Sequence, residues 1–305
     1  MSANDLNIVD VIPQLDSSET GDNSEPSIGV NPADPSQLIA ASFGGSSIPG
    51  ANAPYFVSLD GGTTWSNFGA LTNSDKTIAW VPNGSAVLTA TLVSPDQALP
   101  SGADPDEGGG DSQLNMYSAS QSEVTGGGDF GSPINNFVGS DDNDQPWLRI
   151  SADGQVYMAY NDLGASGGET ASVNVSTDGG TSYSQVISLD RVGGNPQDDP
   201  AIRLAVSGTT TYAIFDRWTQ NIQNDAYGER YDATLVVDKS VIGGADEFTA
   251  LGAGGNGADV SDHIGVFTRR GDTGLTIGLN RIAGGDIAIA VDPNNASHVV
   301  VAYID

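Results

Sequence analysis

Two stretches of the chain repeat one turn-forming pattern. Residues 55–65 read YFVSLDGGTTW, and residues 173–183 read VNVSTDGGTSY. In each stretch a run of strand-forming residues leads into Asp-Gly-Gly, and an aromatic residue closes the pattern. A short Asp side chain accepts hydrogen bonds from nearby backbone N–H groups, and Gly adopts a positive φ without steric cost. The pattern therefore predicts a tight, locked turn between two β-strands.

Both turns follow a strand-turn-strand unit that recurs along the chain. Five copies begin near residues 25, 76, 145, 199 and 286, each with an apolar strand, a turn rich in Pro, Asp, Asn or Gly, and a second apolar strand. Apart from the long last interval, the spacing is close to the ~40 to 50 residues of one four-stranded propeller blade plus variable loops. The repeats predict a β-propeller with about five blade starts.

The composition agrees with an all-β domain. The 305 residues include 40 Gly and 15 Pro, which are the costliest residues in a helix interior and the commonest in turns. Gly-rich stretches between the units are interpreted as surface loops, so we predict one propeller domain over residues 25–305, with a last blade that stops after its second strand. Residues 1–24 form an N-terminal segment, whose strand candidate LNIVDVI (residues 6–12) could close the ring.

The two turn sequences resemble the Asp-box, Ser-x-Asp-x-Gly-x-Thr followed by an aromatic residue, of sialidase-like β-propellers. This resemblance spans residues 25–305 and implies antiparallel four-stranded blades in which the box joins the third and fourth strands. The Phe/Tyr-Arg-Ile-Pro segment found near the start of sialidases is absent. The resemblance implies a structural role, away from the central pocket, for the box residues Asp60, Gly62, Trp65, Asp178, Gly180 and Tyr183.

Charge and cysteine content exclude several kinds of function. Lys and Arg total 10 against 39 Asp and Glu, a formal net charge of -29, so nucleic acid and anionic membranes would be repelled. The absence of cysteine excludes disulfides, zinc-thiolate sites and thiol nucleophiles. The N-terminus lacks an ordinary secretory signal, and no apolar run is long enough for membrane insertion. An acidic, Gly-rich, Cys-free chain resembles bacterial proteins exported by C-terminal signals, which implies an extracellular or cell-surface location.

The candidate site lies where the innermost strands converge, because polar residues near their ends share one axial pocket. Glu25, Asp199 and Asp286 precede inner strands, and the inner strands of two repeats carry Arg149 and Arg203. Paired carboxylates suit glycoside hydrolysis, and arginines bind the carboxylate of an acidic sugar through two parallel hydrogen bonds. We therefore predict the three carboxylates as catalytic and the two arginines as substrate-binding. In the alternative interpretation, the same groups form structural ion pairs between blades.

Aromatic residues and histidines add further candidates. Trp147 lies two residues before one of the arginines, and we predict it as substrate-binding. Tyr212 or Tyr160 could supply a catalytic tyrosine. Of the two histidines, His263 follows an Asp and is the candidate for proton transfer, whereas His298 is expected at the surface.

No cofactor is required by this chemistry, but one acidic run is a candidate calcium site. Its residues are Asp141, Asp142 and Asp144. Carboxylate oxygens are the hard ligands that calcium prefers, although the run does not match the twelve-residue EF-hand loop.

These features predict a glycan-active protein whose partner is a glycan or polysaccharide. As an enzyme it would be a glycosidase of the exo-sialidase type or a polysaccharide lyase. The alternative is a non-catalytic carbohydrate-binding, adhesive or structural module of a larger exported protein, because fold does not fix function. The sequence leaves the oligomeric state open.

Overall fold

A computed structural model describes residues 24–43, 52–72, 75–93, 113–135, 143–162, 170–183, 185–189, 202–225, 228–240, 248, 251–268, 281–283 and 287–303. Within these ranges the chain forms five antiparallel sheets, one short α-helix and one turn of 3₁₀ helix. The regular structure is thus nearly all β, as predicted.

The five sheets correspond to the five sequence repeats, and we call them blades 1 to 5. Blade 1 contains β1 (Ser24–Val30), β2 (Leu38–Phe43), β3 (Asn52–Ser58) and β4 (Ser66–Thr72). Blade 2 contains β5 (Lys76–Trp80), β6 (Ala86–Val93) and β7 (Gln113–Ser120), and α1 (Gln121–Gly126) follows it. Blade 3 contains β8 (Asn143–Ile150), β9 (Val156–Asp162), β10 (Thr170–Ser176) and β11 (Gln185–Ser188).

Blades 4 and 5 depart from the four-stranded pattern. Blade 4 contains β12 (Ile202–Ser207), β13 (Thr210–Asp225), β14 (Gly228–Lys239), β15 (Ala258–Thr268) and β16 (Arg281–Ala283), with the 3₁₀ turn at Ala253–Gly255. In the described part of blade 5 there are two strands, β17 (Ile287–Asp292) and β18 (Asn295–Tyr303). The five blades are therefore unequal in size.

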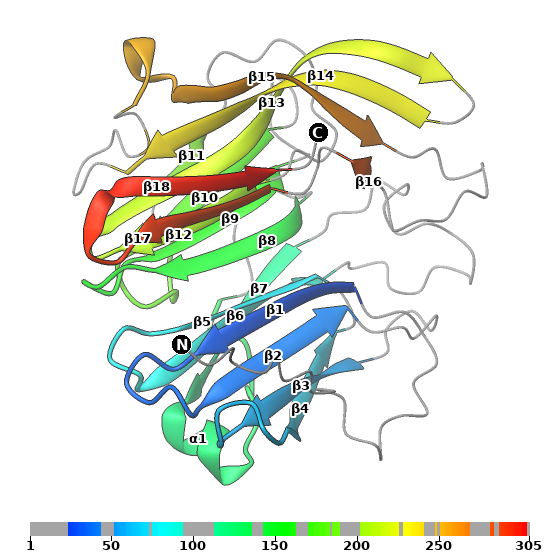
Figure 1. The fold of residues 1–305 in the computed structure, drawn as a ribbon. Coiled ribbons are helices and arrows are strands. Elements are labelled where there is room, and N and C mark those ends of the chain that lie inside the picture. Colours follow the sequence, from blue (N-terminus) through cyan, green and yellow to red (C-terminus); the bar gives the residue numbers. More distant parts are fainter. Residues whose placement is uncertain are drawn as a thin grey trace, which may run out of the picture.

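The first strands of the blades lie next to one another in chain order (Figure 1): β1 contacts β5, β5 contacts β8, β8 contacts β12, and β12 contacts β17. Hydrogen bonds link two of these pairs, because the N–H of Ile78 donates to Ser27 Oγ at 3.1 Å and the N–H of Leu148 donates to Thr77 Oγ1 at 2.9 Å. Within each blade the later strands follow in order from the first. This arrangement is a β-propeller, and it confirms the predicted fold class.

The hydrophobic core lies between consecutive blades. All residues of β5 and β9 are buried, because a strand that is covered on both faces has no solvent-exposed side. Four apolar clusters join blades 1 and 2 (Tyr55, Ile78), 2 and 3 (Leu114, Leu148), 3 and 4 (Tyr157, Phe215), and 4 and 5 (Tyr212, Ile287). The position of each blade thus depends on its neighbours.

The first Asp-Gly-Gly turn joins β3 to β4. Asp60 Oδ1 accepts from the N–H of Thr64 at 2.8 Å, and the N–H of Gly62 donates to Ser58 Oγ at 2.8 Å. Gly62 has a φ of +89°, which a glycine adopts without strain. The indole N–H of Trp65 donates to the Gly62 carbonyl at 3.1 Å. The repeated pattern of this stretch therefore forms one closed turn.

The second turn joins β10 to β11 with the same bonds. Asp178 Oδ1 accepts from the N–H of Ser182 at 2.9 Å, and the N–H of Gly180 donates to Ser176 Oγ at 2.9 Å. Tyr183 packs against the core between blades 2 and 3. Both turns thus join the third and fourth strands of a blade, at matching places in blades 1 and 3.

The charge of the second turn makes stability depend on pH. Hydrogen bonds from the side chain and backbone of Ser182 lower the pKa of Asp178 from 3.8 to about 2. Because the folded state binds this proton more weakly than the unfolded chain, the carboxylate stabilises the fold above pH ~4, and its contribution is lost as the pH falls towards 2. We expect Asp178→Asn to lower Tm at neutral pH, and the difference from the wild type to shrink as the pH falls through this window.

Thermal unfolding followed by circular dichroism at several pH values measures this difference. The equivalent change Asp60→Asn should behave in the same way, because bonds from Thr64 lower the pKa of Asp60. A Tm difference that stays constant over this pH range would contradict the prediction.

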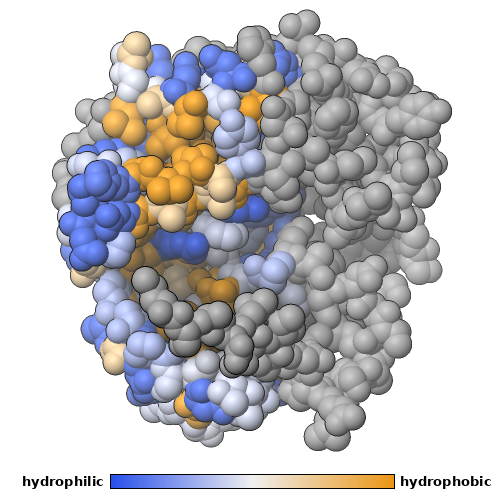
Figure 2. Space-filling model, viewed as in Figure 1, coloured by the Kyte–Doolittle hydropathy of each residue, from blue (hydrophilic) through white to orange (hydrophobic). Residues whose placement is uncertain are grey.

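An apolar area lies on the surface over β17 and β18 (Figure 2). Val300 on β18 is exposed, as are Ile28 and Val30 on β1. The last and first blades therefore carry apolar side chains that the described parts of the chain leave uncovered.

Candidate functional site

Trp147, Arg149 and Arg203 come together on the first strands of blades 3 and 4, and we call them the Arg-Trp cluster. The guanidinium carbon of Arg149 lies 4.8 Å from the centroid of the Trp147 ring, and that of Arg203 lies 4.5 Å from it. Trp147 and Arg149 are two residues apart on β8, so they share one face of the strand, while Leu148 is buried in the core between blades 2 and 3. The sequence placed all three residues in one predicted site, and the structure brings them into contact.

The cluster holds hydrogen-bond donors and positive charge in a poorly solvated place. Arg149 Nη1 donates to the carbonyl of Leu148 at 2.7 Å, and Arg203 Nη1 donates to that of Ile202 at 2.7 Å. The indole N–H of Trp147 is buried and has no hydrogen-bond partner among the described residues. The remaining N–H groups of Arg149 and this indole N–H are donors that a ligand could satisfy.

Electrostatics disfavour the charge of Arg149 in this place. Burial and, to a smaller extent, the neighbouring Arg203 lower the pKa of Arg149 to about 10. Among the residues that the structure describes, no carboxylate lies within ion-pair distance of Arg149. Arg149 still carries its charge at neutral pH, and a bound anion would relieve the cost of burying it.

An irregularity in β8 sets the position of Trp147. The pairing of β8 with β9 breaks between Asp144 and Trp147, and Gln145, just before Pro146, has a φ of +48°. A positive φ at a residue other than glycine is strained, and such bulges re-aim the side chains that follow them. The strand start beside the cluster is therefore shaped differently from a regular β-strand.

Three buried carboxylates lie near the starts of first strands. Asp75 immediately precedes β5, and Asp162 lies opposite Asn143, the first residue of β8. Asp216 is 0% exposed. It follows Phe215 in β13, and Phe215 pairs with Ile202, the first residue of β12. They thus share the strand-start end with the predicted Glu25, Asp199 and Asp286, whereas Arg149 is the last residue but one of β8.

The sequence signal for two of them lies in second strands, which a comparison of the starts of first strands misses. Residues 159–162 read AYND, residues 213–216 read AIFD, and residues 302–305 read AYID. The shared Ala-x-x-Asp pattern would have selected Asp162 and Asp216.

The two candidate tyrosines are held in the core by hydrogen bonds. The hydroxyl of Tyr212 donates to the carbonyl of Ala296 at 2.8 Å, and Tyr212 packs between blades 4 and 5. The hydroxyl of Tyr160 donates to Asn174 Oδ1 at 3.3 Å, and burial, followed by the nearby Asp162 charge, raises the pKa of Tyr160. Each hydroxyl therefore has a hydrogen-bond partner within the core.

Other predicted residues fall partly or wholly outside the described ranges. These are Asp141, Asp142, Asp199 and Asp286. The backbone of Glu25 lies in β1 and that of His263 in β15, and their side chains are not among those described. Asp144 is half-buried in β8. The described residues contain no group of three side chains that could hold a metal ion.

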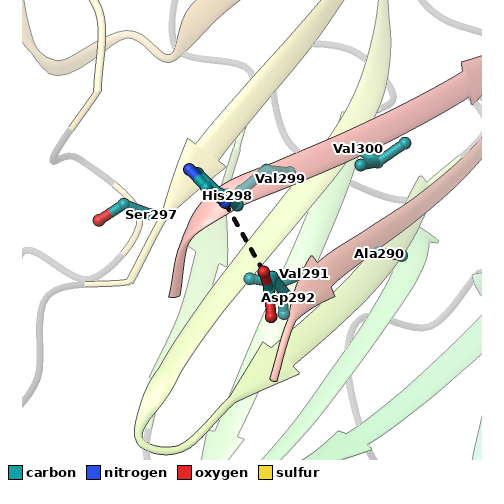
Figure 3. Close-up of a pocket in the computed structure, with 7 residues that line it drawn as sticks. All are labelled: Ala290, Val291, Asp292, Ser297, His298, Val299 and Val300. Atoms are coloured by element: carbon teal, nitrogen blue, oxygen red, sulfur yellow. Dashed lines mark ion pairs between the residues drawn. The ribbon is translucent and has the colours of Figure 1, made fainter. Parts of the chain in front are cut away.

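The described histidine lies away from the cluster, at the hairpin turn of blade 5 (Figure 3). His298 Nδ1 lies 3.6 Å from Asp292 Oδ2, and both side chains border a shallow pocket on β17 and β18. Asp292 is the last residue of β17, so this pair lies at the opposite end of the blade from the strand starts. His298 is thus a surface residue, as expected.

The fold of this chain is similar to that of solved structures, although its sequence matches no known family. No protein-family model and no curated protein matches the chain. The α-L-arabinofuranosidase Arb93A of Fusarium graminearum, solved with an iminosugar inhibitor, is similar with a TM-score of 0.56 and 12% identity over 92% of this chain and 74% of that one. The same GH93 enzyme solved with arabinobiose has a TM-score of 0.57 and 14% identity over the same shares. The chain therefore shares the architecture of β-propeller glycoside hydrolases.

No helix in the described ranges is both long enough and apolar enough to cross a membrane.

Proposed function

We propose that this chain is an exported, Asp-box-type propeller related to sialidases, which binds an acidic glycan at its axis and hydrolyses it as a glycosidase. The Arg-Trp cluster carries the proposal, because two guanidinium groups converge there on the first strands of adjacent blades. The two Asp-Gly-Gly turns support the Asp-box type. The propeller architecture, similar to that of a glycosidase solved with arabinobiose, supports a glycan as the ligand.

The chemistry of the cluster favours an acidic sugar over a neutral one. Arg149 is a buried cation without a carboxylate partner among the described residues. Carboxylate and guanidinium match in geometry, and a charge-assisted pair is about twice as strong as a neutral hydrogen bond. Arg149 and Arg203 both lie over the Trp147 ring, and the indole N–H, which has no partner among the described residues, is the group through which Trp147 would bind the ligand. The substrate class is therefore a glycan containing sialic or uronic acid.

Hydrolysis would use carboxylates at the ends of the blades. Asp199, Glu25 and Asp286 remain predictions from the sequence, and buried Asp162 and Asp216 join them as candidates. One carboxylic acid would donate a proton to the leaving oxygen while a second carboxylate acts as base or nucleophile. Asp216 is the first choice for this role, since it is fully buried beside the start of β12.

The binding step is tested by titration calorimetry with oligosaccharides of sialic or uronic acid. We expect Arg149→Met to weaken binding roughly 30-fold or more, because losing one partner of a buried charged pair costs about 2–5 kcal/mol. Arg217→Met is the matched control: Arg217 also lies over a ring, that of Phe215 at 5.6 Å, but its guanidinium bonds Asp259 at 3.4 Å. Equal affinity for neutral arabinobiose and the acidic glycans would contradict the proposal.

The catalytic step is tested by following release of reducing ends with and without EDTA. Asp216→Asn should lower the rate roughly 10²-fold or more, the usual share of a general acid or base, while binding is kept. Asp60→Asn, in an exposed turn, is the control. Binding without turnover in the wild type would favour the alternative function, a non-catalytic carbohydrate-binding or adhesive module. The hydrogen bonds that Tyr160 and Tyr212 make within the core are consistent with this alternative.

The exported location is tested separately. Fractionation of cells that produce the full-length protein should recover it in the medium or at the cell surface. Recovery from the cytoplasm alone would overturn this part of the proposal.

A further inference from the structure

Three places in the chain carry the tripeptide Asn-x-Ser, in which the middle residue is not proline. They begin at Asn83 (NGS), Asn174 (NVS) and Asn295 (NAS). This tripeptide is the acceptor for N-linked glycosylation, which takes place on surface segments of exported proteins. The structure separates the three copies, because two lie in exposed turns and one lies inside a blade.

The first copy forms the turn between β5 and β6. Asn83 and Ser85 are both exposed. Asn83 Oδ1 accepts from the N–H of Ser85 at 3.0 Å and from Ser85 Oγ at 2.7 Å. The tripeptide is therefore folded on itself as an Asx turn, in which the Asn side chain bonds the backbone two residues later. These bonds use Oδ1, whereas a glycan is attached through Nδ2.

The copy in blade 5 has the same geometry. Asn295 is the first residue of β18 and follows the turn after β17. Asn295 and Ser297 are exposed, and Asn295 Oδ1 accepts from the N–H of Ser297 at 3.1 Å. Figure 3 shows Ser297 directed away from the pair of His298 and Asp292. This tripeptide is therefore a second exposed Asx turn.

The third copy has no room for a glycan in the folded chain. Asn174 lies in β10 and is 2% exposed, and its Oδ1 accepts from the hydroxyl of Tyr160 at 3.3 Å. Ser176 is 0% exposed, and its Oγ accepts from the N–H of Gly180 in the second Asp-Gly-Gly turn. A glycan is bulky and polar, and burying polar groups without partners is costly. A chain with a glycan on Asn174 would therefore not reach this fold.

We propose that Asn83 and Asn295 are attachment sites for N-linked glycans and that Asn174 is not; this rests on the exported location proposed above. The substrate class is an oligosaccharide joined through phosphate to a polyprenyl lipid and transferred by an oligosaccharyltransferase. A bond forms between the Asn Nδ2 and C1 of the first sugar, and the bond between C1 and the phosphate oxygen breaks. The lipid phosphate leaves, and the amide nitrogen loses one proton.

Both sites lie away from the strand starts. Asn83 follows the end of β5, and Asn295 follows the end of β17. The buried Asp75 and Asp162 belong to the strand-start end, because Asp75 precedes β5 and Asp162 pairs with the first residue of β8. Glycans on the two turns would therefore leave the strand-start end open to a substrate.

Mass spectrometry of glycopeptides from the full-length protein, recovered from the medium or the cell surface, tests the sites. We expect sugar on the peptides that contain Asn83 and Asn295, and none on the peptide that contains Asn174. Ser85→Ala should abolish the modification of Asn83 and leave that of Asn295. Ser85→Thr should keep both, because Ser and Thr each complete the acceptor tripeptide. The matched change for the other site is Ser297→Ala.

The outcomes separate the sites from the location. Exported protein in which Asn83 or Asn295 is unmodified would overturn the assignment of that site, and sugar on Asn174 would contradict the argument from burial. Sugar on Asn83 that survives Ser85→Ala would also overturn its assignment. Recovery from the cytoplasm alone would contradict the location instead. The full chain, secreted from a eukaryotic host behind an added signal sequence, then tests the sites by the same expected pattern.

Discussion

Phe215→Ala should lower the free energy of unfolding by about 3 to 5 kcal/mol, the usual cost of deleting a fully buried aromatic side chain. Phe215 is 0% exposed and belongs to the apolar cluster between blades 3 and 4. Partners from both blades surround it, including Tyr157 of blade 3 and Leu204 of blade 4. The cavity would therefore weaken the contact that holds Arg203 beside Arg149.

Chemical denaturation followed by tryptophan fluorescence measures this loss. Val300→Ala is the control, because it removes an apolar side chain that is mostly exposed and should change stability by less than about 0.5 kcal/mol. Losses of similar size for the two variants would contradict a core placed between the blades.

Gly84→Ala should cost about 2 to 4 kcal/mol. Gly84 has a φ of +71°, and a Cβ at this position would overlap the side chains of Asn31 and Ala33. The left-handed conformation costs about 1–2 kcal/mol for alanine. In addition, Asn31 would lose its place, in which its Nδ2 donates to Gln37 Oε1 at 2.8 Å and to the Gly84 carbonyl at 3.3 Å.

Gly208→Ala is the matched control for this substitution. Gly208 has a φ of +61°, but a Cβ there would meet no atom within 4 Å. Its cost should be limited to the backbone term of about 1–2 kcal/mol. Equal losses in thermal or chemical unfolding at the two positions would show that the contact between the turns of blades 1 and 2 carries no stability.

Much of the fold could be predicted from the sequence because each blade begins with a copy of the same repeated sequence unit. The strand-turn-strand units near residues 25, 76, 145, 199 and 286 became the first two strands of the five blades. Local chemistry determines these units: alternating or continuous apolar residues make the strands, and Pro, Asp and Gly make the turns. The same local chemistry made the two Asp-Gly-Gly turns visible.

The sizes of the blades could not be predicted in this way. In blade 2 the chain leaves β7 through Ser120, whose side chain caps α1 together with Glu123. In blade 4 the long β13 and β14 form one sheet with three other strands. Both features depend on which strands the segments outside the repeats pair with. The repeated sequence pattern contains no information about that pairing.

The candidate site was partly predictable. Arg149 and Arg203 occupy matching places in two repeats, three residues after a proline, so a common axial position followed from the repeat. Their stacking on Trp147 depends on the packing of blade 3 against blade 4 and on the irregular start of β8, which spacing does not reveal. The buried Asp162 and Asp216 were missed because they lie on second strands, at the end of β9 and within β13, instead of preceding first strands.

A crystal structure of the wild-type protein with a bound oligosaccharide of uronic or sialic acid tests the central claim most directly. We predict that the sugar carboxylate lies within hydrogen-bond distance of the Arg149 guanidinium, beside Trp147 and Arg203 on the first strands of blades 3 and 4. A sugar bound on another face of the propeller, with no ligand atom contacting the Arg-Trp cluster, would contradict it.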